Sequence, residues 1–294
     1  MAERSRKFWR LRLGSVWRSR LERLLGRRGR AEQVRYSERR MRIPNFRLDG
    51  KVALVTGSSK GLGRAMAFAL GRAGARVAFN YLHSEAAANA TFQAYREAGL
   101  EGGLFRHDVI DPRGVRHLCA EVAGALGPID ILVVNATPAQ PLKPIEQYDW
   151  DFYQEMLDFF VKSPFLLTRE VLPHMKSKRW GRIINITSEV FERAVAPFSA
   201  YVAAKGAQNG WMRSMATELA PFGITSNAIA PGWIPVERHE QDPPEMKEAY
   251  RRGVPMGHMG VPEDLDGAIL LLASEASDFI TGQTIHVNGG TTTY

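Results

Sequence analysis

The sequence has almost no cysteine. Cys119 is the single cysteine among 294 residues, so the chain can form no disulfide within itself. No set of cysteine and histidine residues has the spacing of a zinc site. We therefore expect a reducing environment and an interior that holds no metal.

Long uninterrupted hydrophobic runs are also missing. No segment resembles the apolar centre of a signal peptide, and none could cross a bilayer as a helix. Hydrophobic residues still make up 45% of the chain, which is ample for a packed core. We expect a cytoplasmic protein with one folded domain, residues 46–294, preceded by an N-terminal extension, residues 1–45.

Excess positive charge is confined to the start of the chain. Residues 1–47 hold 16 lysines and arginines against 4 glutamates, whereas the remaining residues hold 23 basic and 27 acidic side chains. The net charge of +8 therefore belongs to the N-terminal arm, and the body is mildly acidic. The body shows no basic face and the arm matches no named module, so we do not expect nucleic acid as a partner.

The N-terminal arm has a pattern of its own. Within residues 8–25, apolar side chains recur every three or four positions among arginines, at Trp9, Leu13, Trp17, Leu21 and Leu24. This is typical of an amphipathic helix, which could lie on an anionic membrane surface without crossing it. The alternatives are a solvated or disordered extension, or an upstream stretch outside the working protein, with Met41 as its start.

Seven short apolar segments alternate with helix-like segments in the body. They span residues 51–56, 76–80, 103–106, 129–135, 182–187, 225–230 and 284–287. Their apolar character is nearly continuous, as in parallel strands that helices cover on both faces. The sequence therefore predicts an α/β fold, a single Rossmann-type doubly wound parallel sheet of about seven strands with helices on both faces. Residues 231–262 are proline-rich and irregular, which favours a mobile lid.

A glycine-rich turn follows the first predicted strand directly. Thr56–Gly63 reads Thr-Gly-Ser-Ser-Lys-Gly-Leu-Gly and opens a helix. Gly57 permits a tight turn, while Gly61 and Gly63 allow the backbone to approach a pyrophosphate and the helix to approach the sheet. Free N–H groups at the helix start would bind the anion. The predicted contacts of a dinucleotide in this turn are Gly57, Ser59, Lys60, Gly61, Leu62 and Gly63.

The end of the second predicted strand bears on which dinucleotide binds. A carboxylate there would hydrogen-bond the adenosine ribose and repel a 2′-phosphate. Residues 80–84 contain none, and the first carboxylate is Glu85. Lys60 offers a cation to such a phosphate instead. We predict NADP(H) as the cofactor, with NAD(H) as the alternative, and Asn80 as one of its contacts.

The sharpest pattern is a serine, a tyrosine and a lysine. Ser188 closes the fifth predicted strand, and Tyr201 and Lys205 share one face of a predicted helix, four residues apart. A phenol with a pKa near 10 is a poor base at neutral pH, and a neighbouring ammonium lowers that pKa. Tyr201 would then transfer a proton while Ser188 holds the substrate oxygen. The pattern indicates hydride transfer between a nicotinamide and a carbonyl or secondary alcohol.

From about Phe46 onward the sequence resembles the short-chain dehydrogenase/reductase family, and within it 3-oxoacyl-carrier-protein reductases. The resemblance rests on Thr56–Gly63, Asp108-Val109, Asn135-Ala136, Ser188, Tyr201–Lys205, Pro231-Gly232 and residues 281–290. It implies further cofactor contacts at Asp108, Val109, Asn135, Ala136, Tyr201, Lys205, Pro231, Gly232 and Ile234. Asp108 would lie near the adenine, and Ile234 would border the nicotinamide. The resemblance also implies a homodimer or homotetramer, joined through helices that flank the active site.

The sequence departs from the family pattern in three places. Thr137 replaces a glycine, and Pro235-Val236 replace a threonine that often contacts the cofactor amide. Phe160 stands where an asparagine normally anchors a water that relays protons from Lys205. Because the triplet itself is intact, we predict an active enzyme that works in the reductive direction on a small-molecule substrate. The alternative is a dinucleotide-binding homologue with little or no activity, acting as a sensor or partner subunit.

Overall fold

The computed structural model describes residues 45–293, and the strands within this range form one sheet. The strands are β1 (Val52–Val55), β2 (Arg76–Tyr81), β3 (Gly102–Arg106), β4 (Ile131–Val134), β5 (Gly181–Ile186), β6 (Ile224–Pro231) and β7 (Thr284–Val287). They lie in the order β3-β2-β1-β4-β5-β6-β7, and every neighbouring pair is parallel. The predicted Rossmann-type sheet and its seven strands are confirmed.

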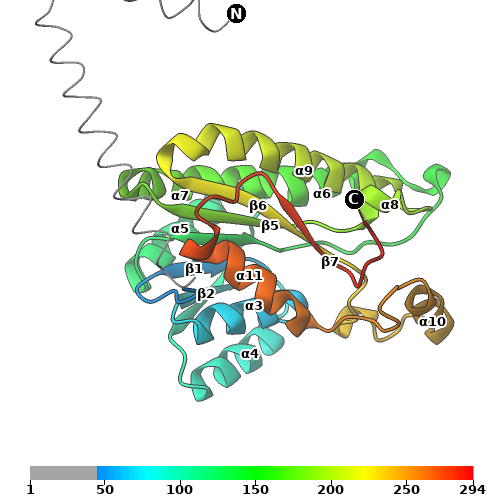
Figure 1. Ribbon diagram of the computed structural model, residues 1–294, viewed down its shortest axis with the longest axis horizontal. Coiled ribbons are helices and arrows are strands. Elements are labelled where there is room, and N and C mark those ends of the chain that lie inside the picture. The colour runs from blue at the N-terminus through cyan, green and yellow to red at the C-terminus, as the bar shows by residue number, and fades with distance from the viewer. Residues whose placement is uncertain (1–44, 294) are drawn as a thin grey trace, which may run out of the picture. The chain divides into compact units, whose positions relative to one another are not determined.

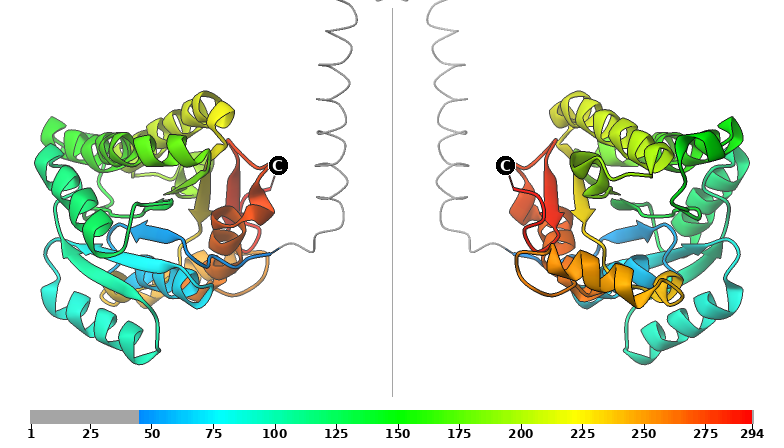
Figure 2. Two further views of the ribbon diagram at one scale, coloured as in Figure 1. Left: turned by 90° about the vertical axis from the view of Figure 1, so that its left-hand side faces the viewer. Right: turned by 90° about the vertical axis from the view of Figure 1, so that its right-hand side faces the viewer.

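Helices cover both faces of the sheet (Figure 1). One face packs against α3 (Gly61–Arg72), α4 (Glu85–Glu97) and α11 (Asp266–Ala273). The opposite face packs against α5 (Pro112–Ala125), α7 (Ser163–Lys178) and α9 (Ser199–Leu219). Figure 2 shows α7 and α9, in green and yellow, on the opposite side of the sheet from α4, in cyan.

The strands are buried from both sides because their side chains alternate between the two layers. In β1, Ala53 and Val55 join the cluster beneath α3, whereas Val52 and Leu54 join the cluster beneath α5 and α7. Each buried aliphatic side chain of valine size or larger contributes about 1.5–3 kcal/mol of hydrophobic stabilisation. This double burial explains why the strands are continuous apolar runs in the sequence.

A widened helical turn precedes α7. α6 (Trp150–Leu157) runs into a π-helical turn, Asp158–Lys162, before α7 begins. This turn carries Phe160, which is 2% exposed. Phe160 belongs to a small apolar cluster with Met156, Ala200, Tyr201 and Ala204. The turn therefore places the phenylalanine ring against the helix that carries Tyr201.

Residues 231–262, which we call the lid, leave the sheet after β6. They contain a short 3-10 turn at Glu237–His239 and the helix α10 (Pro244–Arg252), and another 3-10 turn, Pro262–Leu265, begins at their last residue. Figure 1 shows α10, in orange, beyond the end toward which β5 and β6 run. The expectation of an irregular loop is wrong for residues 244–252. Proline in the first turn of a helix sacrifices no hydrogen bond, so α10 can begin at Pro244, with Pro243 as its N-cap.

The N-terminal extension, residues 1–45, lies outside the described residues except for Asn45, and so does the predicted amphipathic helix at 8–25. Across residues 45–293, every helix is too short or too polar to cross a membrane. Within the same range, no three potential metal-binding side chains come together.

Candidate active site

The predicted site residues follow the carboxyl ends of successive strands. Gly57 comes after β1, Asn80 lies in β2, Asp108 comes after β3, Asn135 after β4, Ser188 after β5, and Pro231 ends β6. In a parallel sheet all these ends lie on one edge. The strand order reverses between β1 and β4, and such a switch point opens the crevice in which α/β proteins bind ligands.

The turn between β1 and α3 needs glycine at specific positions. Gly57 and Gly61 have φ values of +64° and +60°, a backbone region that other residues rarely adopt. A Cβ atom on Gly63 would lie 2.5 Å from the carbonyl oxygen of Gly57 and 2.6 Å from Nδ2 of Asn135. A Cβ atom on Gly57 would lie 2.8 Å from Cα of Ala136. The turn, the start of α3 and the end of β4 are therefore in direct contact.

Asn135 and Ala136 hold this turn from behind. Nδ2 of Asn135 donates to the carbonyl oxygens of Thr56 and Gly57, at 2.9 and 3.0 Å. The hydroxyl of Thr56 accepts from the backbone N–H groups of Asn135 and Ala136, at 2.9 and 3.0 Å. The structure gives both residues a supporting position, and their contact with a cofactor stays a prediction.

The second strand fixes the turn from the other side. The backbone N–H of Asn80 donates to Oγ of Ser58 at 3.1 Å, and Ser58 returns a backbone bond to Asn80 at 3.0 Å. The carbonyl of Ser59 accepts from the Thr91 hydroxyl at 2.7 Å. Because the Asn80 side chain donates to the carbonyl of His107 at 2.9 Å, it links the ends of β2 and β3.

The remaining residues predicted to contact the cofactor in this region differ in their exposure to solvent. Lys60 is exposed at the N-cap of α3, and Leu62 packs half-buried against the core. Val109 is buried, and the carboxylate of Asp108 accepts from the backbone N–H of Ile110 at 2.9 Å. Lys60 is therefore the cation of the turn that solvent and ligands can reach.

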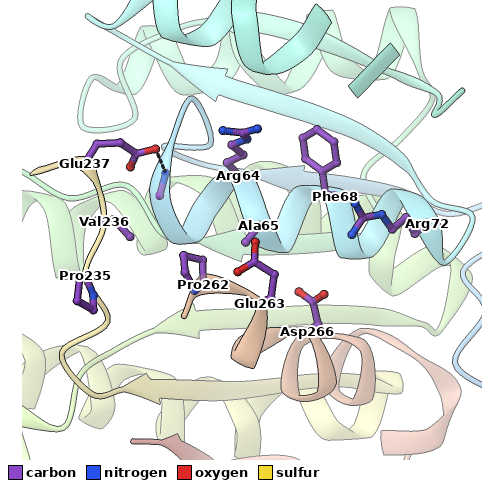
Figure 3. Close-up of a pocket in the computed structure, with 11 residues that line it drawn as sticks. Arg64, Ala65, Phe68, Arg72, Pro235, Val236, Glu237, Pro262, Glu263 and Asp266 are labelled. Carbon is purple, nitrogen blue, oxygen red and sulfur yellow. Dashed lines mark hydrogen bonds between the residues drawn. The ribbon is translucent and has the colours of Figure 1, made fainter. Parts of the chain in front are cut away.

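A lid carboxylate reaches the start of α3 (Figure 3). Oε1 of Glu237 accepts from the backbone N–H of Gly61 at 3.4 Å. A pocket of about 370 Å³ lies beside this contact. Its lining residues are Gly61, Arg64, Ala65, Phe68, Arg72, Pro235, Val236, Glu237, Pro262, Glu263 and Asp266. Ser188, Tyr201 and Lys205 do not line it, so this pocket is separate from the predicted catalytic triplet.

The turn fits the diphosphate of a dinucleotide. Its glycines leave room for close backbone approach, and the first turn of α3 carries no acidic side chain of its own. The Gly61 N–H already binds one anionic group, the Glu237 carboxylate, as expected at the positive end of a helix dipole.

Lys205 is enclosed by its neighbours. Its Nζ donates to the carbonyl of Ile186 at 2.7 Å and to Oε1 of Gln208 at 3.0 Å. The same atom lies 3.7 Å from the centroid of the Phe160 ring, within the range of a cation–π interaction. Burial, and then the charge of Arg238, hold the pKa of Lys205 well below its ordinary value of 10.5. Phe160 thus presents an aromatic face to the amine where the family pattern has an amide.

Tyr201 lies on the same face of α9. Its ring centroid is 5.4 Å from Nζ of Lys205 and 5.4 Å from the Phe160 ring centroid. Burial raises the pKa of the phenol, while the charge of Arg238 and a hydrogen bond with the Ser188 side chain lower it. The structure therefore brings the predicted triplet together.

The electrostatics of the triplet differ from the sequence-based expectation. The sequence predicts that Lys205 lowers the pKa of Tyr201, but the cation that does so in the structure is Arg238 of the lid. The reason is that the Lys205 amine is bound to the Ile186 carbonyl and is itself desolvated. Sequence reasoning missed Arg238 because a lone arginine in a loop carries no distinctive pattern.

The lid begins at the residues predicted to border the nicotinamide. The backbone N–H of Gly232 donates to the carbonyl of Val287 at 3.0 Å, which continues the pairing of Pro231 with β7. Ile234 is buried in the core beneath α3. The side chain of Val236 would lie 3.4 Å from a Cβ atom on Gly61. The Pro235-Val236 departure therefore lies directly beside the glycine turn.

Comparison with known proteins identifies the class. The sequence pattern of a family described as "Enoyl-(Acyl carrier protein) reductase" matches residues 57–292. The chain belongs to the short-chain dehydrogenase/reductase family. It is an NAD(P)-dependent oxidoreductase that acts on the alcohol or carbonyl group of a small-molecule substrate.

Two of the curated relatives carry different names. A 3-oxoacyl-[acyl-carrier-protein] reductase of Staphylococcus aureus is 36% identical over 242 residues, which cover 82% of this chain and 97% of the relative. A 2-dehydro-3-deoxy-D-gluconate 5-dehydrogenase of Formosa agariphila is 34% identical over 255 residues, covering 85% and 96%.

Solved structures with bound NADP also match the chain. A gluconate 5-dehydrogenase from Burkholderia cenocepacia, in complex with NADP and tartrate, matches with a TM-score of 0.79 and 34% identity, covering 84% of this chain and 97% of its own. A 3-oxoacyl (acyl-carrier-protein) reductase from Agrobacterium tumefaciens with NADP bound matches with a TM-score of 0.78 and 34% identity, covering 85% and 98%. The relatives thus share a fold but are named for different substrates.

Proposed function

We propose that the protein reduces a carbonyl group to a secondary alcohol with NADPH and that Tyr201 donates the proton. The observation that carries this proposal is the convergence of Ser188, Tyr201 and Lys205 at the strand edge that also holds the glycine turn. The small-molecule substrate would enter between these residues and the lid.

The protonated form of Tyr201 is the form that carbonyl reduction requires. Because burial raises the pKa of the phenol, the group is protonated at neutral pH and available as an acid. When bound, NADPH would supply the hydride to the carbonyl carbon. Tyr201 then gives its proton to the oxygen, and the Ser188 hydroxyl holds that oxygen in place. The substrate gains one hydride and one proton and leaves as an alcohol.

The surroundings of the second strand support NADP(H) over NAD(H). Residues 80–84 carry no carboxylate that would repel a 2′-phosphate. The next carboxylate along the chain, Glu85, forms an exposed ion pair with Arg106 at 3.4 Å. Lys60 is exposed beside the turn and can meet a phosphate. NAD(H) is the alternative outcome of a direct comparison.

A second candidate function rests on Phe160. Its ring covers Nζ of Lys205 where family members have an asparagine that anchors a water. If this blocks proton resupply, the chain would bind the dinucleotide with little turnover and act as a sensor or partner subunit.

A substrate screen tests the proposal. The full chain is incubated with NADPH, or with NADH, and with ketones, 3-oxoacyl thioesters and keto sugar acids, and loss of the reduced cofactor is followed by absorbance. We expect turnover with at least one carbonyl class, faster with NADPH, and its loss in Tyr201→Phe. NADPH binding without any turnover favours the second candidate, and full turnover in Tyr201→Phe contradicts Tyr201 as the proton donor.

We also propose that the chain works as a homodimer or homotetramer. Support comes from the family, whose members commonly join through the helices flanking the active site, one of which here is α9. Light scattering of the purified chain would give a mass of two or four copies, and a monomeric mass would contradict the proposal.

A further inference from the structure

Glu189, the residue after Ser188, is a buried carboxylate with an unusual number of partners. It is 3% exposed, and burying a carboxylate is costly unless hydrogen bonds compensate its charge. Oε1 accepts from Arg193 at 2.6 Å and from the Tyr250 hydroxyl at 2.8 Å. Oε2 accepts from Nδ2 of Asn288 at 3.0 Å and from the hydroxyl of Thr291. All four partners are donors, so both oxygens must accept.

The partners of Glu189 come from segments far apart in the sequence. Arg193 ends the short helix α8 (Val190–Arg193), and Tyr250 lies in α10 of the lid. Asn288 and Thr291 follow β7, where the chain nears its end. One carboxylate therefore joins the loop after β5, the lid and the C-terminal segment.

Tyr250 extends this network to the beginning of the lid. Its hydroxyl accepts from the backbone N–H of Trp233 at 2.8 Å, and the two rings meet edge to face at 5.4 Å. Burial is the largest cause that raises the pKa of Tyr250 to about 12, with Glu189 also contributing, so this hydroxyl stays a donor. The Tyr250 hydroxyl, which Glu189 holds, thus joins α10 to Trp233 at the beginning of the lid.

The network also reaches the predicted catalytic serine. The backbone N–H of Glu189 donates to the carbonyl of Pro231 at 3.2 Å, and that of Val190 donates to Oγ of Ser188 at 3.3 Å. The backbone N–H groups of Glu189 and of the next residue therefore both donate hydrogen bonds within the site. The loop that carries the Glu189 carboxylate is therefore the loop that fixes the hydroxyl of Ser188.

We infer that Glu189 is a positioning residue that latches the lid to the loop carrying Ser188. The latch sets the distance between a substrate held under the lid and the hydroxyl of Ser188. This inference rests on the proposed reductase function for its kinetic consequences, but the latch itself can be observed without turnover.

Two substitutions separate the parts of the latch. Glu189→Gln keeps the volume, but its amide nitrogen would face donors in place of an accepting oxygen. Tyr250→Phe removes the bond from the lid to the carboxylate and the bond from the Trp233 N–H to the same hydroxyl, and it leaves Arg193, Asn288 and Thr291 on the carboxylate. The matched control is Glu240→Gln, the same change at an exposed position of the lid.

The experiment uses the full chain and three measurements. Tryptic cleavage within α10, after Lys247, Arg251 or Arg252, reports release of the lid. NADPH affinity is measured by fluorescence, and kcat and KM are measured with a substrate from the screen.

We expect Glu189→Gln to speed cleavage in α10 and to lower kcat/KM about 10- to 100-fold, because small misplacements of reacting groups carry losses of this size. Its NADPH affinity should match the wild type. Tyr250→Phe should also speed cleavage but raise mainly KM, because Ser188 stays in place. Glu240→Gln should change none of these quantities.

The latch is overturned if α10 is cleaved at the wild-type rate in both Glu189→Gln and Tyr250→Phe. It is also overturned if kcat and KM stay at wild-type values in both. If Glu189→Gln does not fold, Tyr250→Phe decides the question by its cleavage rate and KM. If the wild type turns over no substrate, the proposed function fails, whereas the cleavage measurement still tests the latch.

Discussion

Tyr201 and Lys205 share one helix face, yet burial moves their pKa values in opposite directions. The phenol becomes a weaker acid and the ammonium a stronger one, because each loses hydration of its charged form. At neutral pH the phenol is therefore neutral and the amine has lost part of its preference for the charged form. The reductive direction uses the neutral phenol directly.

The neutral Tyr201 phenol predicts different pH profiles for carbonyl reduction and alcohol oxidation. With the pKa of Tyr201 raised above its ordinary value of 10.0, the phenol stays protonated at least to that pH. The reductive rate should stay nearly level from about pH 6 to pH 9, whereas alcohol oxidation should rise about tenfold per pH unit as phenolate forms. Initial rates in both directions measure this. A reductive rate that already decreases sharply as the pH is raised from 6 to 8 would contradict a raised pKa, because the phenol would then be losing its proton in that range.

Phe160 is predicted to matter for stability. It is almost completely buried between Lys205 and Tyr201, so Phe160→Ala removes a large side chain from a packed cluster. We expect a loss of about 3–5 kcal/mol in the free energy of unfolding, measured with urea. Phe279→Ala is the matched control, since this ring is 98% exposed, and should change the free energy by less than about 0.5 kcal/mol. Equal effects in both variants would show that Phe160 is not a packing residue.

At the scale of single residues, spacing predicted the triplet but not its surroundings. The three residues are close in sequence: Ser188 follows a predictable strand, and Tyr201 and Lys205 lie in a predictable helix. Arg238 and the partners of Glu189 depend on how the lid and the end of the chain fold back. No local pattern encodes such long-range contacts, so these residues emerged only from the structure.

The contact between α3 and β4 depends on Gly63. A methyl group there would meet the Gly57 carbonyl and the Asn135 amide, so α3 would have to shift away from the turn. We expect Gly63→Ala to lose most of its NADPH affinity, measured by fluorescence titration. Affinity like that of the wild type would place the cofactor elsewhere.

Gly124→Ala is the matched helical control. Gly124 lies in α5, and an added methyl group would meet nothing within 4 Å. This variant should be more stable by about 0.5–1 kcal/mol, because alanine loses less backbone entropy in a helix than glycine. Its NADPH affinity should equal that of the wild type.

At the scale of elements, the seven strands were predictable and two helical features were not. Continuous apolar runs mark strands buried on both faces, so their positions agree with the structure to within a few residues. α10 was missed because its prolines were interpreted as breakers, although one of them lies in its first turn. The π-helical turn before α7 was missed because one widened turn leaves the hydrophobic periodicity nearly unchanged.

At the scale of the whole molecule, the basic arm and the acidic body suggest separate roles. We predict that the arm binds anionic membranes through the Trp/Leu stripe within residues 8–25. The full chain should co-sediment with vesicles that contain anionic lipid, more weakly at high salt, whereas a chain beginning at Met41 should stay in solution. Equal partitioning of the two chains would dismiss this role.

The architecture was predictable as a whole because each level of the sequence agrees with the next. Apolar runs and crossover-length segments favour a parallel sheet, and the glycine turn after the first strand fixes where a dinucleotide would lie. The course of the lid was not predictable, because its packing depends on Glu189 and on residues after β7.

All predicted site residues gather where the strands end, so the opposite edge of the sheet is left with connections from helix to strand. Gly99 and Gly127 lie in two of these connections, both with positive φ, and an added Cβ atom on Gly99 would meet nothing within 4 Å. The predicted site thus occupies the carboxyl-terminal edge of the sheet, and within residues 45–293 the amino-terminal edge carries only connections. A dye or an affinity tag attached at this opposite edge, near Gly99, should therefore leave the predicted site undisturbed, provided that Gly99 itself is kept for its positive φ.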